Sequence, residues 1–332
     1  MFDHYVAVDW AMSNMAIARM TKKSNKVAVI DVSADIKELQ VYLKNLKGKI
    51  CLTIEETTTS RWIYTELSDY VSKLLVCDPY RNRLLSEGPK TDKIDASKLV
   101  RLLKADLLKE VYHSNDKFIE LRKLVSGYED VIKAGVRCKN QRSALFRAYN
   151  KNHKIENSLE KDVDNFVLLG LDEQISNYEK ERERYQKEFK RLKQTNKEIH
   201  RVSEVPGIGI VGAVKIVSRI VDPQRFPSRN HFISYCGLIK HEKISGGKSY
   251  GKKNPRYCRM MKEVFKSATL ASIDGNNQFA DQYRYLIEEK QYSDRNARQS
   301  VTRQIASVVY GVLKSDKKYE PFKRRKNNIE SL

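Results

Sequence analysis

Hydrophobic and polar positions in the first hundred residues follow two different periods. Strand-like runs, with apolar residues consecutive or at every second position, cover residues 4–9, 15–20, 26–32, 49–55 and 73–77. Helix-like runs, with apolar residues three or four apart, cover residues 35–46, 61–71, 79–85 and 92–104. Three strands followed by helix, strand, helix, strand and helix is the element order of the ribonuclease-H-like fold. We therefore predict an α/β domain of that fold.

The chain from about residue 115 to residue 200 has a helical pattern and is highly charged. Its second half holds positions spaced alternately three and four apart, namely Ile175, Tyr178, Arg182, Tyr185, Phe189, Leu192, Asn196 and Ile199. Six of these eight positions are apolar or aromatic, and Asn196 stands where a polar residue typically fixes the register of a coiled coil. The stripe can pack on its own domain or pair two protomers. Because its flanks are so charged, we expect a coiled coil that pairs protomers.

The pattern changes again near Val202, where VPGIGIVGA predicts a glycine-rich turn between helices that resembles a helix-hairpin-helix turn. Helices then continue to about Leu313, interrupted by a predicted loop over residues 241–254. A basic tail follows, which is either a mobile arm or an aid to solubility. We therefore divide the chain into an α/β domain, a helical coiled-coil insertion, a mostly helical C-terminal domain and a basic tail, with bounds 1–108, 109–200, 201–315 and 316–332.

Charge narrows the classes of partner. The 332 residues contain 63 Lys and Arg against 42 Asp and Glu, a net charge of +21. This excess favours a polyanion, nucleic acid first, and the composition excludes a membrane protein and a fully disordered chain. The five cysteines are widely spaced and include no CxxC pair, which argues against a zinc site and for a reducing compartment. We expect a cytoplasmic, nucleoid-associated protein.

Four carboxylates are candidates for one metal site. Asp9 ends the first predicted strand, and Glu55 ends the fourth. Asp92 and Asp95 are three apart, so a helix places them on one face. Clustered carboxylates repel unless cations lie between them, and such an oxygen cluster suits Mg²⁺ or another divalent cation such as Mn²⁺, which can hold a phosphodiester for in-line displacement. Each acid alone could be a strand end or a first-turn helix acid. Glu56 is an alternative to Glu55, and strand alternation favours Glu55 only mildly.

Two further segments carry candidate chemistry. The glycines of the turn, Gly207 and Gly209, would let backbone N–H groups approach a phosphate, although a plain tight turn between helices explains them too. Ser245 lies in the loop ISGGKSYGKKN, where a metal or base could activate it to attack phosphorus. The hydroxyl groups of Ser234, Ser249 and Tyr250 are rivals, and nothing in the sequence shows that His241 faces Ser245.

These segments together resemble the insertion-sequence 110 transposases, which are DEDD-type serine recombinases guided by a bridge RNA. The resemblance runs almost from end to end. It covers the segments YVAVDWAMSNMAIARM, TIEETTTSRWIY, PKTDKIDASKLVRLL, VPGIGIVGA, RFPSRNHFISYCGL, ISGG and PRYCRMMKEVFKSA. PKTDKIDASKLVRLL closely matches the family's Lys-Thr-Asp-x-x-Asp-Ala signature and is the most specific of them.

The resemblance implies a RuvC-like N-terminal domain whose metal-binding acids are Asp9, Glu55, Asp92 and Asp95. It implies that Ser245 attacks DNA, and that the serine of one protomer is completed by the acids of another in a synaptic tetramer. The expected partners are therefore donor and target duplex DNA, a guide RNA and further copies of the chain. We assign nucleic-acid contacts to Gly207, Gly209, Lys248 and Arg259.

Two other functions stay open at this stage. One is a metal-dependent nuclease or Holliday-junction resolvase of the same fold, in which water attacks and Ser245 is only structural. The other is a non-catalytic nucleic-acid-binding protein. A covalent protein–DNA link distinguishes the recombinase from the nuclease, and metal-dependent cleavage distinguishes both from the third class.

Overall fold

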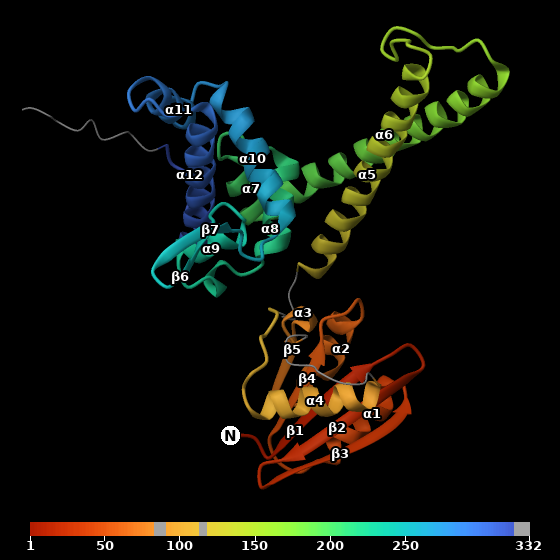
Figure 1. The fold of residues 1–332 in the computed structure, drawn as a ribbon, viewed down its shortest axis with the longest axis vertical. Helices are drawn as coiled ribbons and strands as arrows, with labels where there is room; N and C mark the ends of the chain where they lie inside the picture. Colours follow the sequence, from red (N-terminus) through yellow and green to blue (C-terminus); the bar gives the residue numbers. More distant parts are fainter. Residues whose placement is uncertain (83–90, 113–117, 322–332) are drawn as a thin grey trace, which may run out of the picture. The chain divides into compact units, whose positions relative to one another are not determined.

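The computed structural model describes residues 1–82, 91–112 and 118–321. The chain forms two compact units, Met1–Asp116 and Lys117–Leu332 (Figure 1). Each unit has hydrophobic cores of its own. No helix among the described residues is long and apolar enough to cross a membrane.

The first unit is built on a five-stranded sheet of order β3–β2–β1–β4–β5. Its strands are β1 (His4–Trp10), β2 (Asn14–Thr21), β3 (Ser24–Ser33), β4 (Ile50–Glu55) and β5 (Lys73–Cys77). Strands β1, β2 and β3 pair antiparallel, whereas β1, β4 and β5 run parallel. The predicted strands are confirmed to within a few residues, and the α/β arrangement is consistent with a ribonuclease-H-like fold.

Helices cover both faces of this sheet (Figure 1). On one face α1 (Ile36–Lys44) and α2 (Ser60–Leu67), which continues into a short 3₁₀ turn η1 (Ser68–Tyr70), pack over buried residues such as Leu52. On the other face α4 (Asp92–Lys104) packs over Ala7 and Cys51. The helix predicted at residues 79–85 begins as α3 (Pro79–Asn82), and its remaining residues lie outside the described ones.

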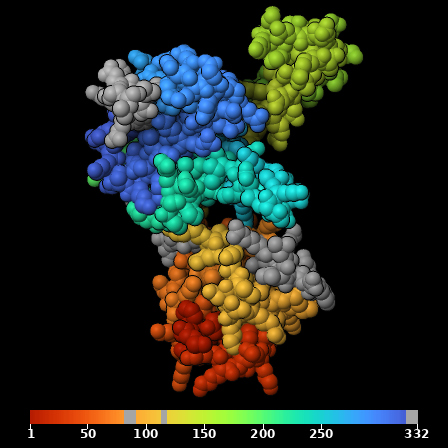
Figure 2. Space-filling model, turned by 60° about the vertical axis from the view of Figure 1, so that its left-hand side comes forward, coloured from red at the N-terminus to blue at the C-terminus, as the bar shows by residue number. Residues whose placement is uncertain are grey.

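The second unit begins with two long paired helices, α5 (Ile119–Arg147) and α6 (Asp162–Thr195). Figure 2 shows one end of this pair projecting from the rest of the unit. The α6 stripe packs against α5 of the same chain, and the pairing of protomers through it stays a prediction. A Cβ atom at Gly135 of α5 would overlap the ring of Tyr178, and one at Gly127 would overlap the Tyr185 hydroxyl. Phe189 is fully buried, with its ring centroid 5.1 Å from that of Tyr128.

Asn196 does not fix a coiled-coil register, because it ends the helix. Its backbone is extended, with φ −116° and ψ 111°, and its side chain accepts a hydrogen bond from the Ile199 backbone N–H at 3.0 Å. Asn196 is therefore the N-cap of the next helix, α7 (Lys197–Ser203).

The remaining helices pack with α7 into a bundle. They are α8 (Ile210–Ile220), η3 (Pro223–Arg225), α9 (Arg229–Tyr235), α10 (Arg259–Ile273), α11 (Gln278–Glu288) and α12 (Asp294–Ser315). Phe232, Phe265 and Phe279 are fully buried in its core. The mostly helical C-terminal region predicted from the sequence is confirmed.

The segment predicted as a loop over residues 241–254 is a β-hairpin instead. Strands β6 (His241–Ser245) and β7 (Lys248–Lys253) pair antiparallel around Gly246–Gly247. Both glycines have positive φ, 54° and 76°, which is what a two-residue hairpin turn requires. Every residue of both strands is exposed.

The start of the predicted basic tail is held to the bundle. Asp316 forms an ion pair with Arg201 of α7, and Tyr319 packs against the hydrophobic core. The prediction of a mobile arm is therefore wrong for residues 316–319, and residues 322–332 lie outside the described part of the chain.

Candidate active site and nucleic-acid contacts

Strand register brings Asp9 and Glu55 to the same edge and face of the sheet. Strands β1 and β4 are parallel neighbours, with Val8 opposite Ile54, so both strands end at one edge. Ala7 and Cys51 pack under α4. Because side chains alternate between faces, Asp9, two residues beyond Ala7, and Glu55, four residues beyond Cys51, lie on the α4 face.

Helix α4 supplies the other two carboxylates from its first turn. Thr91 caps the helix, because its hydroxyl accepts a hydrogen bond from the Ile94 backbone N–H at 3.3 Å. Asp92 and Asp95 follow directly, where the positive end of the helix dipole favours acids. Thr91 was not predicted as a cap from the sequence, although a threonine just before a helical pattern is a cap signal.

The far end of α4 is tied to the sheet by its last residue. The Lys104 ammonium group donates to the Thr21 and Ser24 carbonyls at 3.0 and 2.9 Å. The helix is thus fixed at both ends, by its packing on the sheet and by these bonds, so its first turn has a set position.

The four carboxylates form one electrostatic cluster. The pKa of Asp9 is raised from 3.8 to about 6, first by burial and then by the negative charges of Asp92, Glu55 and Asp95. Glu56, the alternative to Glu55, is not among the groups that raise this pKa. Its backbone N–H instead donates to the Cys77 carbonyl at 2.9 Å. The structure therefore favours Glu55 as the neighbour of Asp9.

The cluster fits a divalent cation in its chemistry, but its side chains are not drawn together around one. Within residues 1–82, 91–112 and 118–321, no three Asp, Glu, His or Cys side chains meet closely enough to hold a metal ion. The donors are all carboxylate oxygens, which Mg²⁺ prefers. A bound cation would also relieve the repulsion that raises the pKa of Asp9.

Ser245 lies at the tip of the hairpin, paired with Lys248 across the turn. Paired residues of an antiparallel ladder lie on the same face, so the Lys248 side chain accompanies the serine. No side chain among the described residues hydrogen-bonds to the Ser245 hydroxyl. His241 pairs with Lys253 at the base of the ribbon, about 13 Å along the strand from Ser245 at 3.3 Å per residue. His241 is therefore not placed to act as the base for Ser245.

The rival hydroxyl groups occupy different places. Ser249 pairs with Ile244, so it lies on the opposite face of the ribbon from Ser245. Tyr250, which is 69% exposed, is two residues beyond Lys248 and shares the face of Ser245 and Lys248. Ser234 is half-buried within α9. Geometry thus leaves Tyr250 as the rival that Ser245 must be tested against.

The glycine-rich turn joins α7 to α8, as predicted. Gly207 has φ +83°, and a Cβ atom there would overlap the Ala268 carbonyl of α10. Packing within the chain thus explains this glycine. Gly209 is the N-cap of α8 and has open space around it, so a phosphate could approach there. Arg259 begins α10 and is exposed.

Comparison with protein families gives the same assignment for both units. Residues 6–151 match the DEDD transposase model of the IS110 group, and residues 199–284 match the model described as the transposase IS116/IS110/IS902 family. The chain belongs to the IS110 family of transposases. No curated protein matches the chain. The first match contains all four clustered acids, and the second contains the turn, the hairpin and Arg259.

Membership establishes the general activity. An IS110-family transposase is a DNA transposase or recombinase, so DNA is its substrate. The DEDD designation implies a divalent cation, in agreement with the oxygen donors at the sheet edge.

Proposed function

We propose that this transposase cuts and rejoins DNA through a phosphoserine intermediate, with Ser245 as the nucleophile and Asp9, Glu55, Asp92 and Asp95 as the metal-holding residues. The observation that supports the proposal is that β1 and β4 end at one edge of the sheet, with Asp9 and Glu55 on the face that α4 covers, and that the first turn of α4 carries Asp92 and Asp95. Such a gathering is costly for folding and is typical of a functional site.

Each residue has a defined part in the proposed reaction. The Ser245 oxygen attacks phosphorus, forming a serine–phosphate bond while the bond from phosphorus to the departing sugar oxygen breaks. The serine loses its proton to a base, and the departing oxygen gains one. A sugar hydroxyl of the partner strand then attacks the phosphoserine and releases Ser245, so each bond broken is replaced by one formed.

The acids would hold the divalent cation, which when bound supplies Lewis-acid stabilisation of charge on the phosphate oxygens. Asp9 and Glu55 come from strand ends, and Asp92 and Asp95 come from a capped helix, so all four have fixed backbone positions. Lys248, beside Ser245, would contribute a positive charge to the incoming phosphate.

We further propose that a guide RNA selects the target and that the acids of one protomer complete the serine of another in a tetramer. The resemblance to bridge-RNA-guided recombinases supports RNA guidance. The net charge of +21 supports binding to two polyanions. Delegating sequence choice to base pairing would leave the protein to bind phosphate backbones.

A hydrolytic nuclease or junction resolvase is the second candidate. The observation that favours it is the Ser245 hydroxyl, which has no hydrogen-bonded base among the described residues. In that case water attacks at the acidic cluster, and the serine has no role in chemistry.

Mixing two inactive variants tests the proposal. Asp9→Asn and Ser245→Ala should each abolish strand exchange on duplex DNA with the guide RNA and Mg²⁺ present. A mixture of the two should regain part of the activity if protomers complete one another, and Ser249→Ala is the matched control that stays active. Full activity of Ser245→Ala would overturn the serine mechanism, and failure of the mixture would overturn completion between protomers.

A further inference from the structure

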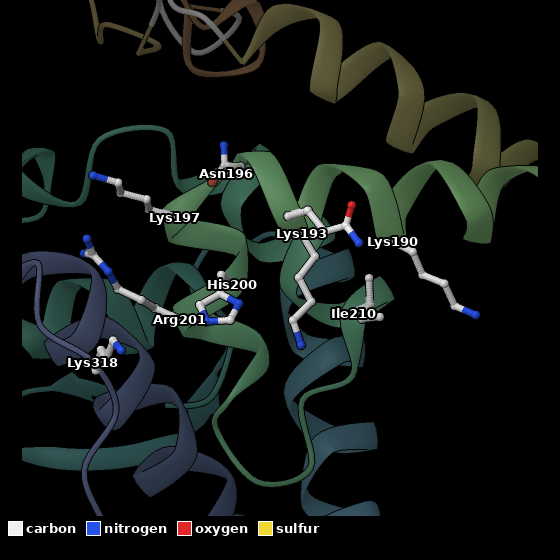
Figure 3. A pocket seen from close by; sticks show the side chains of 9 residues that line it. Lys190, Lys193, Asn196, Lys197, His200, Arg201, Ile210 and Lys318 are labelled. Carbon is white, nitrogen blue, oxygen red and sulfur yellow. The ribbon is translucent and has the colours of Figure 1, made fainter.

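A cavity of about 790 Å³ lies where α6 meets α7. Figure 3 shows its walls, which come from the end of α6, from α7, from the start of α8 and from the segment after α12. Every side chain with a formal charge in this lining is a cation, and no carboxylate is among the lining residues. Such a gathering of like charges indicates that an anion belongs there.

The cations are brought together by the fold and not by helix periodicity alone. Lys190 and Lys193 come from α6, whereas Lys197 and Arg201 follow the helix break at Asn196. Lys318 comes from beyond the end of α12, more than a hundred residues later. The ion pair between Arg201 and Asp316 holds that segment against α7, which places Lys318 in the wall.

The arrangement suits an extended anion better than a compact one. Figure 3 shows Lys190 and Lys197 pointing in different directions, so their charges do not converge on one point. Lys190 and Arg201 are eleven residues apart, which corresponds to about 16 Å of helix axis at 1.5 Å per helical residue. That length covers several phosphates of one strand, at about 3.4 Å of helix axis each.

A helix N-terminus adds to the same surface. Ile210, the first residue of α8, lines the cavity. Its N-cap is Gly209, which has no side-chain cap and has open space around it. The free N–H groups of this eleven-residue helix therefore supply further donors for a phosphate oxygen.

We propose that this cavity is a binding site for the phosphodiester backbone of a nucleic acid, formed by Lys190, Lys193, Lys197, Arg201 and Lys318. This site rests on the proposed function in one respect, namely that its ligand is the DNA or RNA that the recombinase binds. The shared chemistry is the phosphodiester, which both the DNA substrate and the guide RNA carry.

The test uses the full chain and two probes, a duplex DNA and a single-stranded RNA. Their affinities are measured across a series of salt concentrations by fluorescence anisotropy. Lys193→Gln/Lys197→Gln should weaken binding of at least one probe. The slope of log affinity against log salt should become less negative by about 2 for duplex DNA, or by about 1.4 for single-stranded RNA.

A second variant tests whether the cavity, and not merely a basic helix, makes the site. Lys318→Gln should reduce the slope by about 1 for the same probe, because only the folded arrangement brings Lys318 to α7. The matched control is Lys180→Gln/Lys266→Gln, which removes two exposed charges outside the cavity and should leave the slope less changed than the cavity variant does.

The probe that loses affinity identifies the source of the backbone. Equal slopes for the cavity and control double variants with both probes would overturn the proposal, as would no effect of Lys318→Gln. Ser245→Ala should keep wild-type binding, so a failed serine mechanism with a reduced slope in the cavity variants would leave this site standing. A confirmed serine mechanism with unchanged slopes in the cavity variants would support the mechanism and overturn the binding site.

Discussion

The acidic cluster and the serine hairpin carry the two halves of the proposed chemistry, and they are built in opposite ways. Asp9 and Glu55 extend from strands whose neighbouring residues are almost fully buried. Ser245 lies on a two-stranded ribbon in which every residue is exposed. An isolated hairpin is marginally stable in water, whereas groups that hold a metal need fixed positions. The comparison teaches that buried strands fix the backbone positions of Asp9 and Glu55, whereas the exposed ribbon gives Ser245 no such support.

Removing one acid should have the largest effect on activity. Asp9→Asn should lower strand exchange by at least about a hundredfold, since a group that stabilises transition-state charge is lost. DNA binding should stay nearly unchanged. Glu56→Gln, next to the cluster but outside the surroundings of Asp9, is the control. Full exchange activity of Asp9→Asn, or of the wild type in excess EDTA, would show that the cluster holds no catalytic metal.

Truncating one apolar residue in each region tests the contrast in stability. Leu52→Ala, at a fully buried position of β4, should lower the free energy of unfolding by about 2–5 kcal/mol. Ile244→Ala, on the hairpin and 65% exposed, should change it by less than about 0.5 kcal/mol. Chemical denaturation followed by circular dichroism measures both. A large loss for Ile244→Ala would mean that the ribbon is packed after all.

Placing a charge within the apolar stripe of α6 tests whether the stripe packs against α5 of the same chain. Tyr185→Asp should lower the unfolding free energy of the second unit by about 1–3 kcal/mol, because it places a charge against Tyr128 and Gly127 of α5. Light scattering should give the same mass as the wild type. A shift towards half the mass with unchanged stability would instead support the pairing of protomers through this stripe.

The pH dependence of stability should show the smallest effect. The folded-state pKa of Asp9, about 6, lies above the ordinary value of 3.8, so folding favours the protonated form. The charged form therefore costs stability above pH 6 and has no effect below about 3.8. Asp9→Asn in metal-free buffer should raise the Tm of the first unit by at most a few degrees at pH 8 and leave it unchanged near pH 3.5. An equal shift at both pH values would show that the burial of a charged Asp9 beside the other acids is not the cause.

The sequence predicted where the four acids lie because strand alternation and helix spacing are local properties. The period of two placed Glu55 on the face opposite Ile54, and the spacing of three placed Asp92 and Asp95 together. The sequence could not decide whether Glu55 or Glu56 is the neighbour of Asp9. That choice depends on the pairing of β4 with β1, which is a contact between segments far apart in the chain.

Two features of the second unit could not be predicted, for different physical reasons. The hairpin was missed because the segment over residues 241–254 was interpreted as a loop, and Gly246–Gly247 was not recognised as the positive-φ pair of a tight turn. The contact between the α6 stripe and α5 was missed because the pattern of a stripe cannot show what covers it. The answer lies in α5, where Gly127 and Gly135 leave room for the rings of Tyr185 and Tyr178.

Mapping the protein–DNA link tests the central claim most directly. A nicked duplex that traps the intermediate is incubated with the transposase, its guide RNA and Mg²⁺, and the covalent adduct is digested and sequenced by mass spectrometry. The account predicts one adduct, on Ser245, that is absent in Ser245→Ala and in Asp9→Asn and present in Ser249→Ala. An adduct on Tyr250, or cleavage with no adduct at all, would contradict it.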